Sequence, residues 1–210
     1  SHITGIENVP RLLLAGKLSS YYRPLRTVSY TLDYTLNKKF WYRFANHTYH
    51  KGRVTLGHHV SNIFYHVVTA LLTYLVIYRL TFSAGAAFIG ASLFALHPVH
   101  TDSVTYLSGR RDILFTLFYL AGFYYFLRYR QDKRPRFIAA ALFMYVLSLG
   151  SKEMGVTLPG LFIAYDLVKN FSHTGSRIGA GYVKALFSSA KKSIKQSALL
   201  YSLVGLGGVA

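Results

Sequence analysis

The sequence predicts an all-α fold, in which amphipathic helices on the membrane surface precede a polytopic bundle of transmembrane helices. Of the 210 residues, 52% are hydrophobic and only 15% are charged, whereas about a quarter of the residues in a soluble domain are charged. The mean hydropathy of +0.27 agrees with this composition. Several apolar runs approach the roughly 20 residues that a helix needs to cross a bilayer.

Charge and cysteine content narrow the classes of partner. The formal net charge is +17, which on a soluble domain is typical of nucleic-acid binding. Here the basic residues lie in connectors beside apolar runs, so we expect membrane lipids and lipid phosphates as partners and no nucleic acid. The absence of cysteine excludes disulfides, thiolate metal sites and cysteine nucleophiles.

Residues 1–58 are predicted to form a juxtamembrane region outside the cytoplasm. Residues 3–18 carry apolar side chains beside basic ones, which indicates an amphipathic helix on the membrane surface. Residues 21–36 alternate in a way that also fits a strand, but their aromatic content favours a second interfacial helix. Residues 37–57 have no clear periodicity and are predicted to form a loop.

Residues 59–210 are predicted to form the transmembrane bundle, with five complete spans and the beginning of a sixth. The second span is rich in glycine and alanine, which predicts close packing inside the bundle. Pro159-Gly160 predicts a kink in the fifth span. The chain lacks an initiator methionine and stops inside an apolar run, so we expect a fragment of a longer protein. The spans are expected at 59–80, 84–96, 113–127, 136–149 and 154–168, with the sixth starting at 197.

Helix parity places the connectors on two sides of the membrane. Residues 1–58, 97–112 and 151–153 share one side, and the connectors after each odd-numbered span share the other. Lysine and arginine are commoner in the short connectors of the second side, although residues 1–58 are also basic. The positive-inside rule therefore favours a cytoplasmic second side and an active site that faces away from the cytoplasm.

The most polar connector is residues 95–112, A-L-H-P-V-H-T-D-S-V-T-Y-L-S-G-R-R-D. Polar groups gathered at a membrane surface are candidates for handling a charged substrate. Three interpretations of His97, His100 and Asp102 stay open. His97 caps a helix while the others bond to neighbouring loops; or the three side chains bind a divalent metal such as Mn or Zn; or they contact the substrate.

Arginines close this connector and also occur near the N-terminus. Arg110 and Arg111 precede a helix that is expected to begin near Asp112, where guanidinium groups and the helix dipole favour phosphate binding. An Arg–Asp pair that fixes the loop is an equally good interpretation. Arg23 is predicted either to contact a phosphate or to anchor the chain at the interface.

Two further polar positions lie close to predicted spans. Lys152 and Glu153 form an expected ion pair at a helix junction, with Glu153 as a base the less favoured alternative. His66 lies inside the first span, where an interhelical hydrogen bond is favoured over catalysis. The sequence has no G-x-S-x-G, Walker A, H-E-x-x-H or G-x-G-x-x-G motif, so hydrolase, nucleotide-binding and zincin functions have no support.

Several of these residues carry a family resemblance. The chain resembles the transmembrane and tetratricopeptide-repeat O-mannosyltransferases and their bacterial relatives, in collinear order over roughly residues 20–170. The matching motifs are R-P-L at 23–25, H-x-x-N at 59–62 with His66, F-A-L-H-P-V-H-T-D-S-V-T-Y-L-S-G-R-R-D at 94–112, S-K-E-M-G-V-T-L-P at 151–159 and Y-D at 165–166.

The resemblance implies a GT-C-type fold and an inverting transfer of a mannose-like sugar. The donor would be a polyprenyl-phosphate sugar and the acceptor a protein or another hydroxyl compound. The base would be an acidic residue upstream of Ser1, because the acidic pair of the family's first loop is not in this chain. Asp33 also departs from the family, which often has asparagine there, and residues 37–57 are longer and more basic than expected.

The resemblance also assigns roles to the polar residues. Arg110, Arg111 and Arg23 would bind the donor phosphate, and five residues would shape the donor site. No cofactor is required beyond the lipid-linked donor, although the metal set above remains an alternative. The expected location is the bacterial inner membrane or the endoplasmic reticulum. The residues expected to shape the donor site are His97, His100, Asp102, Lys152 and Glu153.

Two alternatives come from other functional classes. A catalytically inactive structural subunit of a membrane complex would keep the fold without the chemistry. A transporter of a lipid-linked substrate would carry paired inverted repeats, and the sequence shows none.

Overall fold

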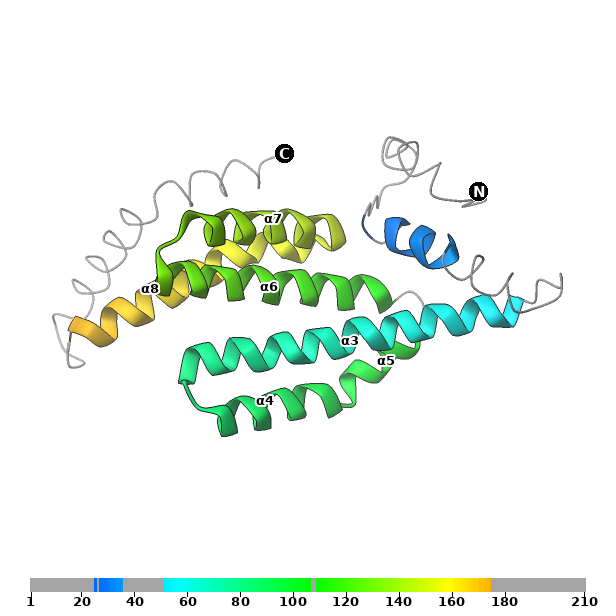
Figure 1. Cartoon of the computed structure of the whole chain (residues 1–210), viewed down its shortest axis with the longest axis horizontal. Coiled ribbons are helices and arrows are strands. Elements are labelled where there is room, and N and C mark those ends of the chain that lie inside the picture. Colours follow the sequence, from blue (N-terminus) through cyan, green and yellow to red (C-terminus); the bar gives the residue numbers. More distant parts are fainter. Residues whose placement is uncertain (1–24, 26, 36–50, 107–108, 175–210) are drawn as a thin grey trace.

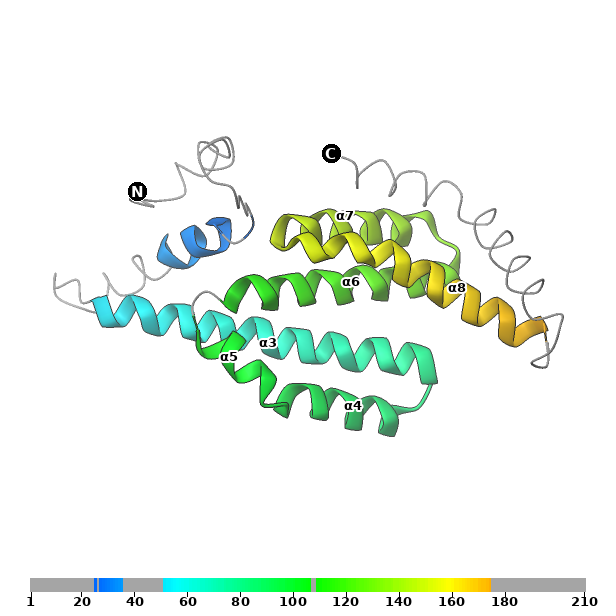
Figure 2. The same ribbon diagram turned by 180° about the vertical axis from the view of Figure 1, so that it is seen from behind.

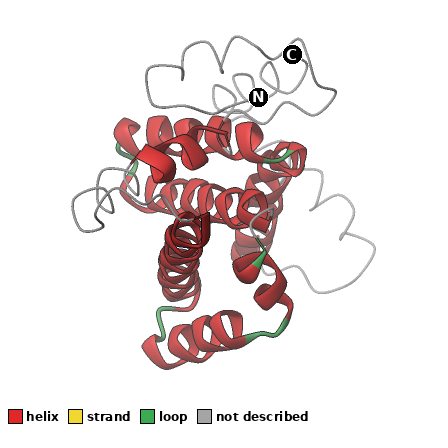
Figure 3. Ribbon diagram, turned by 90° about the vertical axis from the view of Figure 1, so that its right-hand side faces the viewer, coloured by secondary structure: helices red, strands yellow, loops and turns green. Residues whose placement is uncertain are grey.

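The computed structural model of the chain describes residues 25, 27–35, 51–106 and 109–174. These residues form helices joined by short turns, with no strand among them (Figure 3). The prediction of an all-α fold is therefore confirmed for this part of the chain. Residues 27–35 are helical, which decides between helix and strand for the second juxtamembrane segment.

Six α-helices and a short 3₁₀ helix follow in the described ranges beyond residue 50. In chain order they are α3 (Lys51–Thr81), α4 (Ala84–Leu96), α5 (Val99–Thr105), α6 (Arg110–Asp132), α7 (Pro135–Ser151), η3 (Glu153–Thr157) and α8 (Leu158–Thr174).

The helices stack in layers around α3 and α6. Helix α3 packs between α4 and α6, and α7 covers the other side of α6 (Figure 1). Helix α8 crosses α6 and α7 on the face seen in Figure 2. Helix α5 lies beside the early turns of α6, and the helix of residues 27–35 lies over the N-terminal half of α3.

An aromatic core holds α6, α7 and α8 together. The rings of Phe126 and Phe162 stack with centroids 4.2 Å apart, and both side chains are fully buried. Tyr165 meets Phe126 edge-on at 5.9 Å. Aromatic pairs of this kind add about 0.5–1.5 kcal/mol to the stability that burial alone provides.

Two tight turns reverse the chain at one end of the bundle. Phe82 and Lys133 each adopt a positive φ, of 55° and 56°. Ser83 then caps α4, because its hydroxyl accepts a hydrogen bond from the Ala86 amide at 3.3 Å. Pro135 occupies the first turn of α7, where its missing N–H costs nothing. Both turns lie in the gaps between predicted spans, at 81–83 and 128–135.

Two predicted helix starts are wrong. Helix α3 begins at Lys51, so residues 51–57 are helical rather than a loop, while the division of the chain at residue 58 stays a prediction. Helix α6 begins at Arg110 rather than near Asp112. The connector at 97–112 contains the helix α5. In each case the helix includes polar residues, which a prediction from apolar periodicity alone leaves out.

The kink predicted at Pro159-Gly160 is also wrong. Helix α8 begins at Leu158, so Pro159 lies in its first turn, where proline needs no hydrogen-bond partner for its nitrogen. The change of direction is made by η3 instead. Gly155 permits it, because a Cβ there would lie 2.8 Å from the Leu149 nitrogen.

Helix α4 lies at the edge of the bundle rather than inside it. Its small face packs on α3, with Ala87 fully buried. Most of its large apolar side chains face outward, and Leu96 is 82% exposed, whereas Phe94 is half-buried beside His100. The small residues thus bring two backbones together as predicted, but on one side of the helix only.

One helical segment among the described residues, Gly57–Thr81 of α3, is long and apolar enough to cross a membrane. Helices α4 and α7 are apolar but shorter, with 13 and 17 residues, or about 20 and 26 Å at 1.5 Å per residue. The predicted count of five spans therefore stays a prediction. The helix predicted at 3–18, most of the loop at 169–196 and the sixth span lie outside the described residues.

Candidate functional site

Arg110 is the centre of a polar network where α3, α6 and the helix of residues 27–35 meet. Its side chain is fully buried, and one terminal nitrogen forms an ion pair with Asp33 at 2.5 Å. Its Nε donates to Asn62 Oδ1 at 2.7 Å, and its Nη2 donates to the His58 carbonyl at 2.9 Å. The guanidinium also lies 4.6 Å from the ring centre of Tyr30.

Asn62 carries this network to α5. Its Nδ2 donates to the Val104 carbonyl at 3.2 Å, while its Oδ1 accepts from Arg110. Both halves of the buried amide are therefore satisfied, as a buried polar group requires. The asparagine of the H-x-x-N motif fixes α5 against α3 and α6.

Asp33 is the acidic partner of the network and is also nearly buried. Burial by itself disfavours the carboxylate, but a hydrogen bond from His58 Nδ1 at 3.1 Å and the charge of Arg110 outweigh it. Ser61 donates a further hydrogen bond at 3.0 Å. Together these contacts hold the pKa of the Asp33 carboxyl below its ordinary value.

The network decides how Arg110 can act. All three of its side-chain nitrogens bind protein groups, which agrees with the Arg–Asp interpretation of the sequence, although the partner is the distant Asp33. To bind Arg110, a phosphate would have to displace the buried carboxylate of Asp33. The phosphate-binding role of Arg110 therefore stays a prediction, which these contacts do not favour. Gly109 belongs to the same arrangement, since a Cβ there would lie 2.5 Å from the Ser103 carbonyl oxygen.

The last residue of G-R-x-D joins a second family motif. Asp112 Oδ1 accepts a hydrogen bond from Lys152 Nζ at 2.6 Å, which connects α6 to the end of α7. Lys152 was expected to pair with Glu153, and the structure pairs it with Asp112. Arg111 Nε lies 3.7 Å from Asp112 Oδ2, and the arginine side chain is 40% exposed. Arg111 and Lys152 are therefore cations that a ligand can reach.

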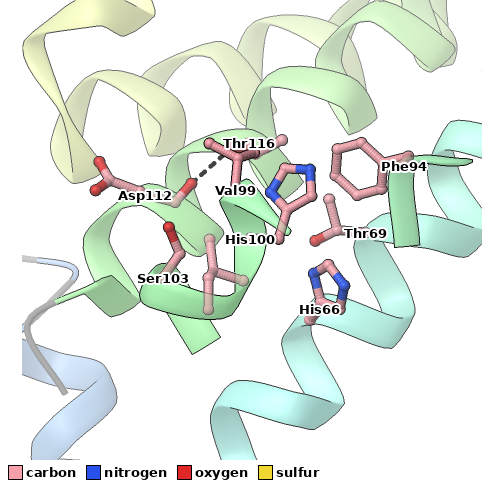
Figure 4. A pocket seen from close by; sticks show the side chains of 9 residues that line it. His66, Thr69, Phe94, Val99, His100, Ser103, Asp112 and Thr116 are labelled. Carbon is pink, nitrogen blue, oxygen red and sulfur yellow. Dashed lines mark hydrogen bonds between the residues drawn. The ribbon is translucent and has the colours of Figure 1, made fainter. Parts of the chain in front are cut away.

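A cavity of about 220 Å³ opens beside this pair, between α3, α4, α5 and α6 (Figure 4). Asp112 contributes to its wall, and three hydroxyl side chains and two imidazoles face the same space. The lining residues are His66, Thr69, Phe94, Val99, His100, Ser103, Asp112, Ile113 and Thr116.

The three histidines near the cavity have different surroundings. His66 Nε2 lies 3.2 Å from the Ala95 carbonyl, which is the interhelical hydrogen bond that the sequence favours. His97 Nδ1 accepts from the Val99 amide at 3.2 Å and so caps α5. Burial, together with His66 and His97, lowers the pKa of His100, so this imidazole is neutral at pH 7.

The remaining candidates are less closely associated with the cavity. Asp102 and Glu153 are exposed, and among the described residues no three His, Asp or Glu side chains are grouped to hold a metal ion. Arg23 lies outside the described residues. Asp166 of the Y-D motif pairs with Arg130 at 2.7 Å, near the other end of α6.

Sequence reasoning missed Asp33 as a site residue, and it also missed the hydroxyl groups of Thr69, Ser103 and Thr116. A signal for the hydroxyls existed. His66 and Thr69, His100 and Ser103, and Asp112 and Thr116 are each three or four residues apart, which places the members of each pair on one helix face.

Comparison with known proteins supports the resemblance. The family described as dolichyl-phosphate-mannose-protein mannosyltransferase matches residues 18–201 of the chain. Protein O-mannosyl-transferase TMTC3 of Homo sapiens is 28% identical over 152 residues, which cover 70% of the chain and 15% of the relative. Protein O-mannosyl-transferase TMTC1 of Mus musculus is 30% identical over 173 residues, which cover 77% of the chain and 17% of the relative.

A third relative comes from another animal. Protein O-mannosyl-transferase F38B6.6 of Caenorhabditis elegans is 30% identical over 154 residues, which cover 72% of the chain and 20% of the relative. The chain thus spans 15% to 20% of the length of these three relatives. No solved structure matches the chain.

Proposed function

We propose a membrane glycosyltransferase function, because the chain belongs to the dolichyl-phosphate-mannose-protein mannosyltransferase family. The donor is a polyprenyl-phosphate sugar of mannose type, and the acceptor is a hydroxyl group on a protein. The fold is a GT-C-type bundle in the bacterial inner membrane or the endoplasmic reticulum, with its active site facing away from the cytoplasm. These assignments extend the mannosyltransferase activity named for the relatives to a chain that covers a fifth of their length or less.

One structural observation carries the proposal. Motif residues that are far apart in the sequence converge at one end of the bundle, around the cavity beside Asp112. Asn62 and Arg110 build the frame of this end, and Lys152 and Arg111 supply accessible positive charge. A lipid phosphate at the membrane surface needs such cations.

The reaction breaks one bond and forms one. The acceptor oxygen attacks C1 of the sugar, its proton passes to a carboxylate base, and the bond from C1 to the phosphate oxygen breaks. The polyprenyl phosphate leaves with the bonding electrons, so negative charge grows on the phosphate in the transition state. A cation beside the phosphate stabilises that charge more than it stabilises the ground state.

Lys152 is the side chain that we assign to this task, with Arg111 beside it. Lys152 uses one of its three donors on Asp112, and its side chain is 24% exposed. Arg111 holds the variable position of the family motif, so we expect its contribution to be the smaller. Arg110 acts through Asp33 and Asn62, as a positioning residue.

The test is transfer by the full-length protein in vesicles that contain labelled polyprenyl-phosphate mannose and a protein acceptor. We expect label on the acceptor. Lys152→Gln should lower the rate roughly ten- to hundredfold, the effect of losing one charge-assisted contact. The control is Lys169→Gln on α8, where the lysine is exposed and bonds only to Tyr165 among the described residues.

The outcomes separate the candidate functions. Equal rates for the two variants would remove Lys152 from the mechanism. A parent protein that binds the donor without transferring the sugar would support the inactive structural subunit instead.

A further inference from the structure

We propose that the cavity between α3, α4, α5 and α6 binds the uncharged sugar of the donor, separately from its phosphate. This proposal rests on the proposed function and deepens it. The volume of about 220 Å³ is below the range of about 300–1,000 Å³ that drug-sized ligands occupy. A single compact group such as a pyranose suits it better than a longer ligand.

The hydrogen-bonding groups of the cavity match a polyol. Thr69 Oγ1 donates to the Tyr65 carbonyl at 2.7 Å and Thr116 Oγ1 donates to the Asp112 carbonyl at 2.8 Å, so both oxygens keep lone pairs that can accept. Ser103 Oγ has no partner among the described residues. These three oxygens are suited to sugar hydroxyls, whereas the Asp112 carboxylate points away from the two imidazoles (Figure 4).

The imidazoles add further hydrogen-bonding groups. His66 donates from Nε2 to the Ala95 carbonyl, and its Nδ1 is left for a ligand. His100 is neutral at pH 7 for the reasons given above, so it offers one donor and one acceptor. Its ring lies 4.3 Å from the ring of Phe94, which adds an apolar surface for the C–H face of a sugar.

The charges of the wall argue against phosphate in the cavity. Among the residues that the structure describes, no lysine or arginine lines it, and Asp112 is its one formally charged residue. A buried phosphate next to a carboxylate would be unpaired, which is costly in a low-dielectric site. Lys152 bonds to the Asp112 carboxylate, which points away from the two imidazoles (Figure 4). In this arrangement the sugar of the donor lies in the cavity and its phosphate lies beside Lys152, with Asp112 between them.

The experiment measures how tightly the full-length protein binds two synthetic lipids, polyprenyl-phosphate mannose and the same polyprenyl phosphate without sugar. Ser103→Leu fills the cavity and should weaken binding of the mannosyl lipid about tenfold or more, with unchanged binding of the bare lipid phosphate. Thr101→Leu, on the exposed side of α5, is the size-matched control and should change neither affinity.

A second pair of variants removes a hydroxyl group without changing the shape of the side chain. This pair tests the inference if Ser103→Leu does not fold. Thr69→Val should weaken binding of the mannosyl lipid about two- to tenfold, which is the usual effect of losing one hydrogen bond. Thr73→Val is its control, because Thr73 makes the same bond to the residue four positions back but does not line the cavity.

Each outcome has one meaning. The deciding variant is Ser103→Leu or, if that variant does not fold, Thr69→Val. If it weakens the binding of both lipids equally, or of neither, the sugar does not occupy the cavity and the inference is overturned. If the parent protein transfers mannose in the same preparation, the proposed function survives that failure. If the parent neither prefers the mannosyl lipid nor transfers its sugar, both the inference and the proposed function fail.

Discussion

The two ends of α6 hold carboxylate–cation pairs that look alike in sequence and differ in structure. At the first end, Asp112 pairs with Lys152, and its side chain is 33% exposed at the wall of a cavity. Toward the other end, Asp166 pairs with Arg130, and its side chain is 1% exposed beside the aromatic core. Both carboxylates belong to family motifs. The comparison teaches that carboxylates in similar ion pairs can differ widely in exposure, and that exposure decides which of them a ligand could reach.

The same comparison applies within the first end. Arg110 and Arg111 are adjacent in sequence, yet the first side chain is fully buried and the second is 40% exposed. The helix turns by about 100° between neighbouring residues, so one faces Asp33 and the other does not. The buried arginine supports the site, and the exposed one is available to a ligand.

The largest expected effect comes from breaking the buried Asp33–Arg110 pair. Arg110→Ala leaves Asp33 buried without its cation and should destabilise the protein by about 3–5 kcal/mol. The phosphate interpretation of Arg110 predicts lost transfer with intact folding for this variant, whereas the Arg–Asp interpretation, which the buried pair favours, predicts a loss of stability. Thermal unfolding in detergent measures this. Arg110→Met combined with Asp33→Leu should recover much of the loss, and an unchanged melting temperature of Arg110→Ala would contradict the account.

The pair near the opposite end should give a somewhat smaller effect. Asp166→Asn removes the charge that faces Arg130, but the side chain of Arg130 is 12% exposed and can partly reach solvent. The loss should therefore lie at or below about 3 kcal/mol. In the same unfolding measurement, Asp112→Asn should cost less than about 1 kcal/mol, because a partly exposed ion pair contributes little to stability. A larger loss from Asp112→Asn than from Asp166→Asn would reverse the comparison.

Helix α4 allows a packing test away from both ends. Gly90→Leu should destabilise the protein by about 1–3 kcal/mol through overpacking, because a Cβ there would lie 2.5 Å from Ile77 Cδ1 on α3. Gly85→Leu is the matched control on the same helix, since a Cβ at Gly85 meets nothing within 4 Å. Equal melting temperatures for the two variants would show that α4 does not pack on α3 as described.

The smallest expected effect is on the pH dependence of stability. The pKa of Asp33 is lowered on folding from its ordinary value of 3.8, so the unfolded chain takes up the proton first as the pH falls. The stabilisation is complete above about pH 4 and is lost as the pH falls through the folded pKa below 3.8. Denaturant unfolding from neutral pH to about pH 3 should show this loss, and it should be weaker in Asp33→Asn. Identical acid profiles would contradict it.

Apolar runs and turn residues predict most of the helices, because the apolar residues of one helix lie close together in the sequence. Helix ends are less well predicted. Helices α3 and α6 begin with polar residues, Lys51 and Arg110, which a pattern of apolar residues does not mark. Pro159 shows the same limit, since a proline can mark either a kink or a first turn, and only the position of the preceding residues distinguishes them.

The site is only partly predictable for a related reason. The residues of the 95–112 connector stand out by composition, and the spacing of His100 and Ser103 places them on one face. The pairing of Asp33 with Arg110 is different, because helical periodicity holds no information about which distant segments meet. Long-range ion pairs follow from the packing of whole helices, so Asp33 is visible as a partner only in the structure.

The most direct test compares Asp112→Asn with Asp166→Asn in mannose transfer by the full-length protein, with rates expressed per folded molecule. Asp112 lies between the cavity and Lys152, so its variant should lose roughly tenfold or more of the parental rate, as expected for about 1.4 kcal/mol of transition-state stabilisation. Asp166→Asn should keep the parental rate in the molecules that remain folded. A parental rate in Asp112→Asn together with a tenfold loss in Asp166→Asn would contradict the assignment of the functional end.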